Sequence, residues 1–125
     1  MSVCVAVTDS AEGRAALTAA AQEAVLLAVP LVAVNLTGAD LDTGALSSGA
    51  LGPGLSVEVI DPRRPSSLDE IEQVLQVLED RPEITRLVVG VRKRTPVGKA
   101  VLGSIAQRLI LEARIPVLSV HSSQA

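Results

Sequence analysis

The chain has 125 residues, 48% of them hydrophobic and 20% charged, and a formal net charge of -3 at pH 7. These values are typical of a globular domain with its own core, so we expect residues 1–125 to form one domain and to have no nucleic-acid partner. No apolar run approaches the roughly 20 residues of a membrane helix, and we expect a cytoplasmic protein with no membrane partner. One cysteine excludes an internal disulfide and a multi-cysteine zinc site.

The chain contains no Phe, Tyr or Trp. Proteins commonly hold exposed bases on aromatic faces. A base bound here would instead be held by aliphatic contacts and backbone hydrogen bonds. The core must be built from Leu, Val, Ile and Ala.

Five short apolar runs predict buried strands. In chain order they are Val3–Val7, Leu31–Leu36, Leu55–Ile60, Ile84–Val91 and Pro116–Val120. Because the runs are continuously apolar rather than alternating, we expect a parallel sheet that is covered on both faces.

Three stretches between these runs predict helices. The first follows Asp9 or Ser10, either of which can cap it, and has apolar residues at helical spacing. The second begins at Ser67, which forms a capping-box pattern with Glu70. The third spans Gly103–Ala113.

Residues 37–54 contain five of the nine glycines and predict a loop or a truncated crossover where a further helix would be expected. The remaining strands alternate with helices. This alternation predicts an α/β fold, an open doubly wound sandwich around a five-stranded parallel sheet.

The stretch from Gly90 to Ser104 predicts a strand that runs through a basic, glycine-rich loop into a helix. Backbone N–H groups and the positive end of a helix dipole favour anions there, phosphate above all. The loop holds four of the eleven Lys and Arg residues of a chain with negative net charge. The alternative is an ordinary strand-to-helix turn with solvated charges. The candidate residues are Gly90, Arg92, Lys93, Gly98, Gly103 and Ser104.

The glycines of this stretch match a known nucleotide-binding pattern of Gly, two residues, Gly, nine residues, and Gly-Ser or Gly-Thr. Gly90 and Gly103-Ser104 stand at the matching separation, and Lys93 takes the place of the middle glycine. Other segments look like the strands and helices of the same proteins: Val5–Leu17, Ala106–Arg108 and Ile115–Val120. Together these segments resemble the universal stress protein family.

The resemblance implies a Rossmann-like sheet of the adenine nucleotide alpha hydrolase type, with strand order 3-2-1-4-5. In such a sheet ligands bind outside the carboxyl ends of the strands, where the chain reverses direction. We therefore expect Thr8-Asp9 and Gly90-Val91 to meet in one crevice.

The resemblance also implies roles for individual residues in binding ATP or AMP, with or without magnesium. Thr8 or Asp9 would bond the nucleoside, and Leu36 would pack near the adenine. Arg92, Lys93, Gly103 and Ser104 would hold the phosphates. Leu36, Ala6, Val7 and Val89 either line the same pocket or are plain strand residues, and we expect the latter for Val7 and Val89. No catalytic residue is evident, so we expect a regulatory protein and not an enzyme, with weak ATP hydrolysis left open.

The last strand would lie at an edge of the sheet, where an apolar strand invites pairing. The resemblance implies a homodimer through this strand, whose residues are Pro116, Val117, Leu118, Ser119 and Val120. The alternative function is a dimeric interaction module of the same fold that binds no nucleotide.

Cysteine and histidine often act as catalytic residues or metal ligands, and the chain has one of each. Cys4 lies inside the first strand, and we expect a buried, inert thiol. His121 follows the last strand without neighbouring ligands, and we expect it to be solvated.

Overall fold

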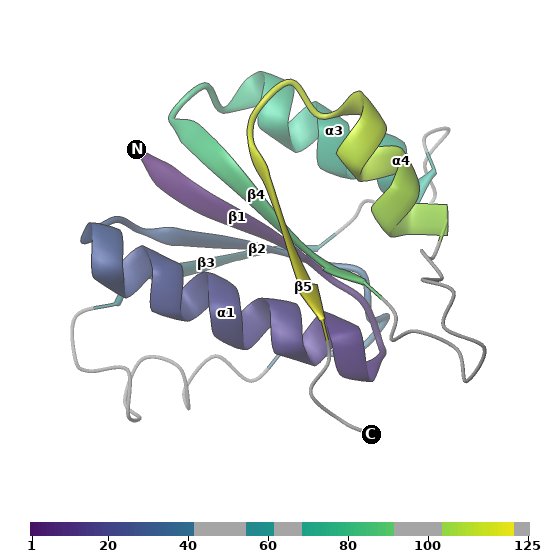
Figure 1. The fold of residues 1–125 in the computed structure, drawn as a ribbon, viewed down its shortest axis with the longest axis horizontal. Helices are drawn as coiled ribbons and strands as arrows, with labels where there is room; N and C mark the ends of the chain where they lie inside the picture. The colour runs from purple at the N-terminus through teal and green to yellow at the C-terminus, as the bar shows by residue number, and fades with distance from the viewer. Residues whose placement is uncertain (42–54, 62–68, 92–103, 122–125) are drawn as a thin grey trace.

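The computed structural model describes residues 1–41, 55–61, 69–91 and 104–121. These residues form a five-stranded sheet of order β3-β2-β1-β4-β5 in which all four neighbouring pairs are parallel. Helix α1 covers one face, and α3 and α4 lie side by side on the other (Figure 1). The elements are β1 (Ser2–Val7), α1 (Ala11–Leu27), β2 (Leu31–Asn35), β3 (Val57–Ile60), α3 (Glu70–Asp80), β4 (Ile84–Val91), α4 (Ser104–Glu112) and β5 (Val117–His121).

The predicted α/β fold, parallel direction and strand order are confirmed. Small differences occur at the element ends. β3 begins at Val57 rather than Leu55, and β5 extends to His121. Pro116 precedes β5 and contributes its carbonyl, which accepts a hydrogen bond from the Leu87 N–H at 3.0 Å.

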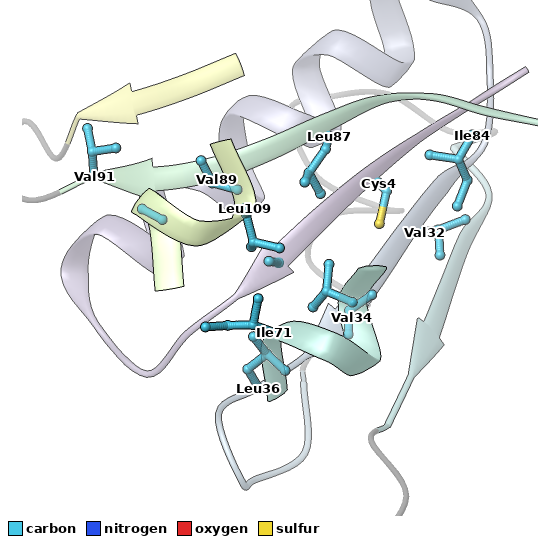
Figure 2. Packing of buried hydrophobic residues seen from close by; sticks show 13 residues of the cluster. Cys4, Val32, Val34, Leu36, Ile71, Ile84, Leu87, Val89, Val91 and Leu109 are labelled. Atoms are coloured by element: carbon cyan, nitrogen blue, oxygen red, sulfur yellow. The ribbon is translucent and has the colours of Figure 1, made fainter. Parts of the chain in front are cut away.

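Each face of the sheet has its own core. Val3, Val5 and Val7 point toward α1, whose buried face is made of small residues. Cys4 and Ala6 alternate with them and belong to the core cluster under α3 and α4. Figure 2 shows Cys4 within this cluster. Burial raises the pKa of the Cys4 thiol to about 12, so the expected buried, inert cysteine is confirmed.

The helix caps explain where α1 and α3 begin. Ser10 is the N-cap of α1, and its Oγ accepts a hydrogen bond from the Gly13 N–H at 2.9 Å. For α3 the predicted cap at Ser67 was wrong, because Asp69 is the N-cap and its Oδ1 accepts from the Glu72 N–H at 2.8 Å.

The Asp69 carboxylate also joins two helices. Its Oδ2 accepts a hydrogen bond from Arg108 of α4 at 3.0 Å. The hydrogen bond from the Glu72 N–H has the largest effect in lowering the pKa of Asp69 below its ordinary value, and Arg108 lowers this pKa further. The carboxylate at this cap therefore connects the start of α3 to α4. A serine hydroxyl is neutral and could not form the same ion pair with Arg108.

The chain leaves β2 through a tight turn that Asn35 organises. The Asn35 Nδ2 donates to the Ala39 carbonyl and to Asp61 Oδ1, at 2.6 and 2.9 Å. Its Oδ1 accepts from the Thr37 N–H and hydroxyl, and Gly38 has a φ of +78°. The rest of the predicted loop, residues 42–54, lies outside the described residues. No helix among the described residues is long and apolar enough to cross a bilayer.

We predict that the sheet core carries most of the stability. Leu87 is fully buried in β4, whereas Leu111 of α4 is 74% exposed. Leu87→Ala should lower the free energy of unfolding by about 2–5 kcal/mol, because it removes buried methyl groups and leaves a cavity. The control Leu111→Ala should stay within about 0.5 kcal/mol. Urea unfolding followed by far-UV circular dichroism measures both, and equal effects would contradict the packing described.

Candidate functional site

A cleft opens at the carboxyl ends of β1 and β4, beside the first turns of α1 and α4. Its volume is about 230 Å³. This is below the roughly 300–1,000 Å³ of typical small-molecule sites. Its apolar wall comes from residues near the carboxyl ends of β1 and β4 and from one face of α4: Ala6, Val89, Ile105, Ala106 and Leu109.

The polar wall comes from the segment that links β1 to α1. The hydroxyls of Thr8 and Ser10 are hydrogen-bonded to each other at 2.7 Å, and the Ser10 N–H donates to the Thr8 carbonyl at 2.9 Å. Asp9 and Glu12 also line the cleft. The Asp9 side chain is 80% exposed and lies 4.0 Å from Arg14. This wall therefore offers hydroxyl and carboxylate groups, which can bond the hydroxyl or amino groups of a ligand.

Gly90 is needed for the packing of α1 on β4. A Cβ atom at Gly90 would overlap the carbonyl group of Glu12 in the first turn of α1. Gly13 is equally constrained, because a Cβ there would overlap the carbonyl of Thr8. These two close approaches hold the start of α1 against the ends of β1 and β4. They account for Gly90 whether or not a ligand lies nearby.

The structure brings together three of the predicted site residues. Thr8 and Asp9 after β1 and Gly90 in β4 line the same cleft, as the strand order predicts. Ala6 also lines it, and so does Val89, for which a plain strand role was expected. The topological convergence of two distant segments is thus present in the molecule.

Other predicted residues lie elsewhere. Leu36 is buried in the core cluster under α3 and α4, where Ile71 also lies (Figure 2), and it does not belong to the cleft lining. Val7 belongs to the core on the α1 side. Ser104 begins α4. The remaining predicted phosphate-binding residues lie outside the described residues: Arg92, Lys93, Gly98 and Gly103.

Several residues that line the cleft were not among the predicted site residues. The sequence predicts Ser10 only as a helix cap, although the position of Ser10 and Glu12 after β1, where the chain reverses direction, also predicts access to the cleft. Ile105, Ala106 and Leu109 share one face of α4 by helical spacing, and that face adjoins the end of β4.

The described residues contain no group of three or more His, Cys, Asp or Glu side chains that could hold a metal ion. His121 is exposed at the end of β5, as expected.

Comparison with known proteins agrees with this geometry. Residues 68–121 match a family model described as the universal stress protein family. A universal stress protein of Mycolicibacterium smegmatis is 50% identical over 58 residues, which are 46% of this chain and 44% of that protein. The match thus spans less than half the length of that relative.

Solved structures extend the similarity over the whole fold. A universal stress protein from Archaeoglobus fulgidus superposes with a TM-score of 0.70 at 27% identity, covering 96% of this chain and 98% of that one. A structure of the Archaeoglobus protein in complex with dAMP has a TM-score of 0.63 at 24% identity, with coverage of 96% and 97%. The fold is that of an α/β protein of the universal stress type. The family-model match, the partial match to the Mycolicibacterium protein and the shared fold all agree with the resemblance to universal stress proteins that the sequence shows.

We predict that Gly90→Ala destabilises the protein by roughly 3 kcal/mol, at the upper end of the overpacking range, because the added methyl group meets backbone that cannot turn aside. The comparison is Gly38→Ala, where a Cβ meets nothing within 4 Å. That change should cost only the left-handed backbone penalty of about 1 kcal/mol. Urea unfolding compares the two variants, and a smaller loss at Gly90 than at Gly38 would refute the close approach.

Proposed function

We propose that this protein is a regulatory module that binds an adenine nucleotide, ATP or AMP, in the cleft between β1 and β4. The observation that carries the proposal is the convergence of Thr8, Asp9 and Gly90 beside the first turn of α4. The dAMP complex of the Archaeoglobus family member supports it by similarity of fold.

The cleft residues suggest how each part of the ligand would be held. The base or sugar would pack against aliphatic groups such as Val89 and Ile105. The Thr8 hydroxyl or the Asp9 carboxylate would bond the nucleoside. The phosphates would lie toward the start of α4, where a helix N-terminus favours anions. The involvement of Leu36, Arg92, Lys93, Gly98, Gly103 and Ser104, and any bound magnesium, stays a prediction from the sequence.

We propose binding without catalysis as the main activity. Within the described residues, the titratable side chains that line the cleft are Asp9 and Glu12, and both belong to the loop and helix start rather than to a nucleophile-and-base pair. Weak hydrolysis of ATP stays open. A single domain spanning residues 1–125 and a cytoplasmic location also stay predictions.

We propose a homodimer formed through β5. Among the described residues this strand pairs with β4 on one side only, and Leu118 is 43% exposed on it. An apolar edge strand can pair with its own copy about a two-fold axis. The interface would comprise Pro116, Val117, Leu118, Ser119 and Val120. If the cleft binds no nucleotide, the same edge would carry the alternative function of a dimeric interaction module.

The nucleotide proposal predicts saturable heats when ATP, AMP or cyclic AMP is titrated into nucleotide-free protein in a calorimeter, with and without magnesium. Thr8→Val keeps the β-branched shape but removes the hydroxyl. It should weaken binding about fivefold, because one hydrogen bond contributes a net of roughly 1 kcal/mol.

The matched control is Thr18→Val on the exposed side of α1, which should leave the affinity unchanged. Heats that equal those of buffer at millimolar nucleotide would refute nucleotide binding and favour the interaction module. Equal affinities for the Thr8 and Thr18 variants would remove Thr8 from the site.

The dimer proposal predicts that the chain sediments as a dimer at micromolar concentration. Leu118→Glu should give a monomer, because it places a charge in the apolar edge of β5. Leu111→Glu adds the same charge on α4, where the native leucine is already 74% exposed, and should leave the dimer intact. A wild-type monomer in sedimentation velocity would exclude this assembly.

A further inference from the structure

A second hollow lies between α3 and α4, at the amino ends of β4 and β5 and thus at the opposite end of the sheet from the cleft. We call it the α3–α4 groove. Its volume is about 420 Å³, larger than that of the cleft. Its lining residues are Leu75, Leu78, Glu79, Pro82, Glu112, Arg114 and Ile115.

The floor of the groove is aliphatic. Leu75 and Leu78 of α3 and Ile115 before β5 are half-buried and pack against the core cluster that α3 and α4 cover. Their remaining exposed surface is contiguous with the solvent-facing hollow. The floor can therefore receive one aliphatic side chain without disturbing the core.

The rim carries charges. Glu79, Glu112 and Arg114 are all exposed. Both helices end here without a basic residue in the last turn, and the side chain of Arg81, the C-cap residue of α3, pairs with Glu58 of β3. Helix C-termini carry partial negative charge and normally attract Lys, Arg or His, so two acid-rich ends side by side break a local preference. Departures from a local preference of this kind are expected at functional sites, such as a surface that binds a partner protein.

The ion pairs show which charges are already neutralised. Glu112 pairs with Arg108 at 3.0 Å, whereas Asp80 beside the rim accepts a hydrogen bond at 2.8 Å from the neutral amide of Gln76 and keeps its charge. Within the described part of the chain, Glu79 makes no ion pair. Arg114 adds one positive charge to the described lining. With Glu112 paired, the carboxylates of Glu79 and Asp80, which form no ion pair with a described residue, outweigh the one positive charge of Arg114, so the rim is negative.

We propose that the α3–α4 groove docks a segment of a partner protein that presents an aliphatic side chain next to Lys or Arg. The aliphatic group would fill the floor, and the cation would face Glu79 and the carbonyl end of α3. An apolar centre with an exposed charged rim is the anatomy of a protein interface. A small-molecule site instead buries its polar groups, and here the charged side chains of the lining are exposed to solvent.

This proposal is independent of nucleotide binding, since the two sites share no lining residue among those described. The test is an NMR titration of the isotope-labelled full chain with three end-blocked peptides, Gly-Lys-Leu-Lys-Gly, Gly-Glu-Leu-Glu-Gly and Gly-Lys-Ser-Lys-Gly. The first should give saturable shifts at Leu75, Leu78 and Ile115. The acidic peptide and the serine peptide should give none that saturate.

Two charge reversals on α3 sharpen the test. Glu79→Lys should weaken binding of the basic leucine peptide roughly threefold or more, because it turns attraction at the rim into repulsion. Glu72→Lys makes the same change of charge in the first turn of the same helix, away from the groove, and should have little effect. Both positions are exposed, so both variants should fold.

Several results would overturn the proposal. One is the absence of saturable shifts with the basic leucine peptide at millimolar concentration. Another is equal weakening by the two charge reversals, which would indicate non-specific electrostatics. Binding of butylammonium as tight as that of the peptide would assign the groove to small cations. Shifts at the groove that depend on protein concentration alone would assign it to a second copy of the chain.

Discussion

The close contact between the first turn of α1 and the ends of β1 and β4 is the constraint on which the cleft depends. Gly13 lies against the backbone of Thr8, and Gly90 lies against the backbone of Glu12, with no room for a Cβ atom at either point. These contacts fix the Ser10 cap and its hydroxyl partner beside the strand ends. The cleft is thus a consequence of how tightly one helix packs on two parallel strands.

Because the chain has no aromatic residues, the apolar surfaces of the cleft and of the α3–α4 groove are aliphatic. The core is made of short aliphatic side chains, and small residues on the buried face of α1 let that helix approach the sheet. A base in the cleft would gain dispersion contacts but no stacking on an aromatic ring. Selectivity there would depend on polar atoms at the mouth, chiefly those of Thr8 and Asp9.

The sequence predicted the sheet well because buried parallel strands have continuous runs of apolar, often β-branched residues, such as Val3–Val7. It predicted the meeting of Thr8 with Gly90 because strand order alone brings those ends together. It failed at the start of α3, since Ser67 and Asp69 both suit a cap and the choice of Asp69 involves Arg108, a contact between residues 39 apart in the chain. Leu36 is buried in the core cluster under α3 and α4, and its contact with a base stays a prediction.

The central claim is that the end of the sheet between β1 and β4 is where this protein binds its nucleotide. The most direct test is a backbone amide NMR titration of nucleotide-free protein with AMP. The account predicts saturable shifts that centre on Thr8, Asp9, Gly90 and Ala106, with the amides of the α3–α4 groove unchanged. Saturable shifts that centre on another surface, or none at all at millimolar AMP, would contradict it.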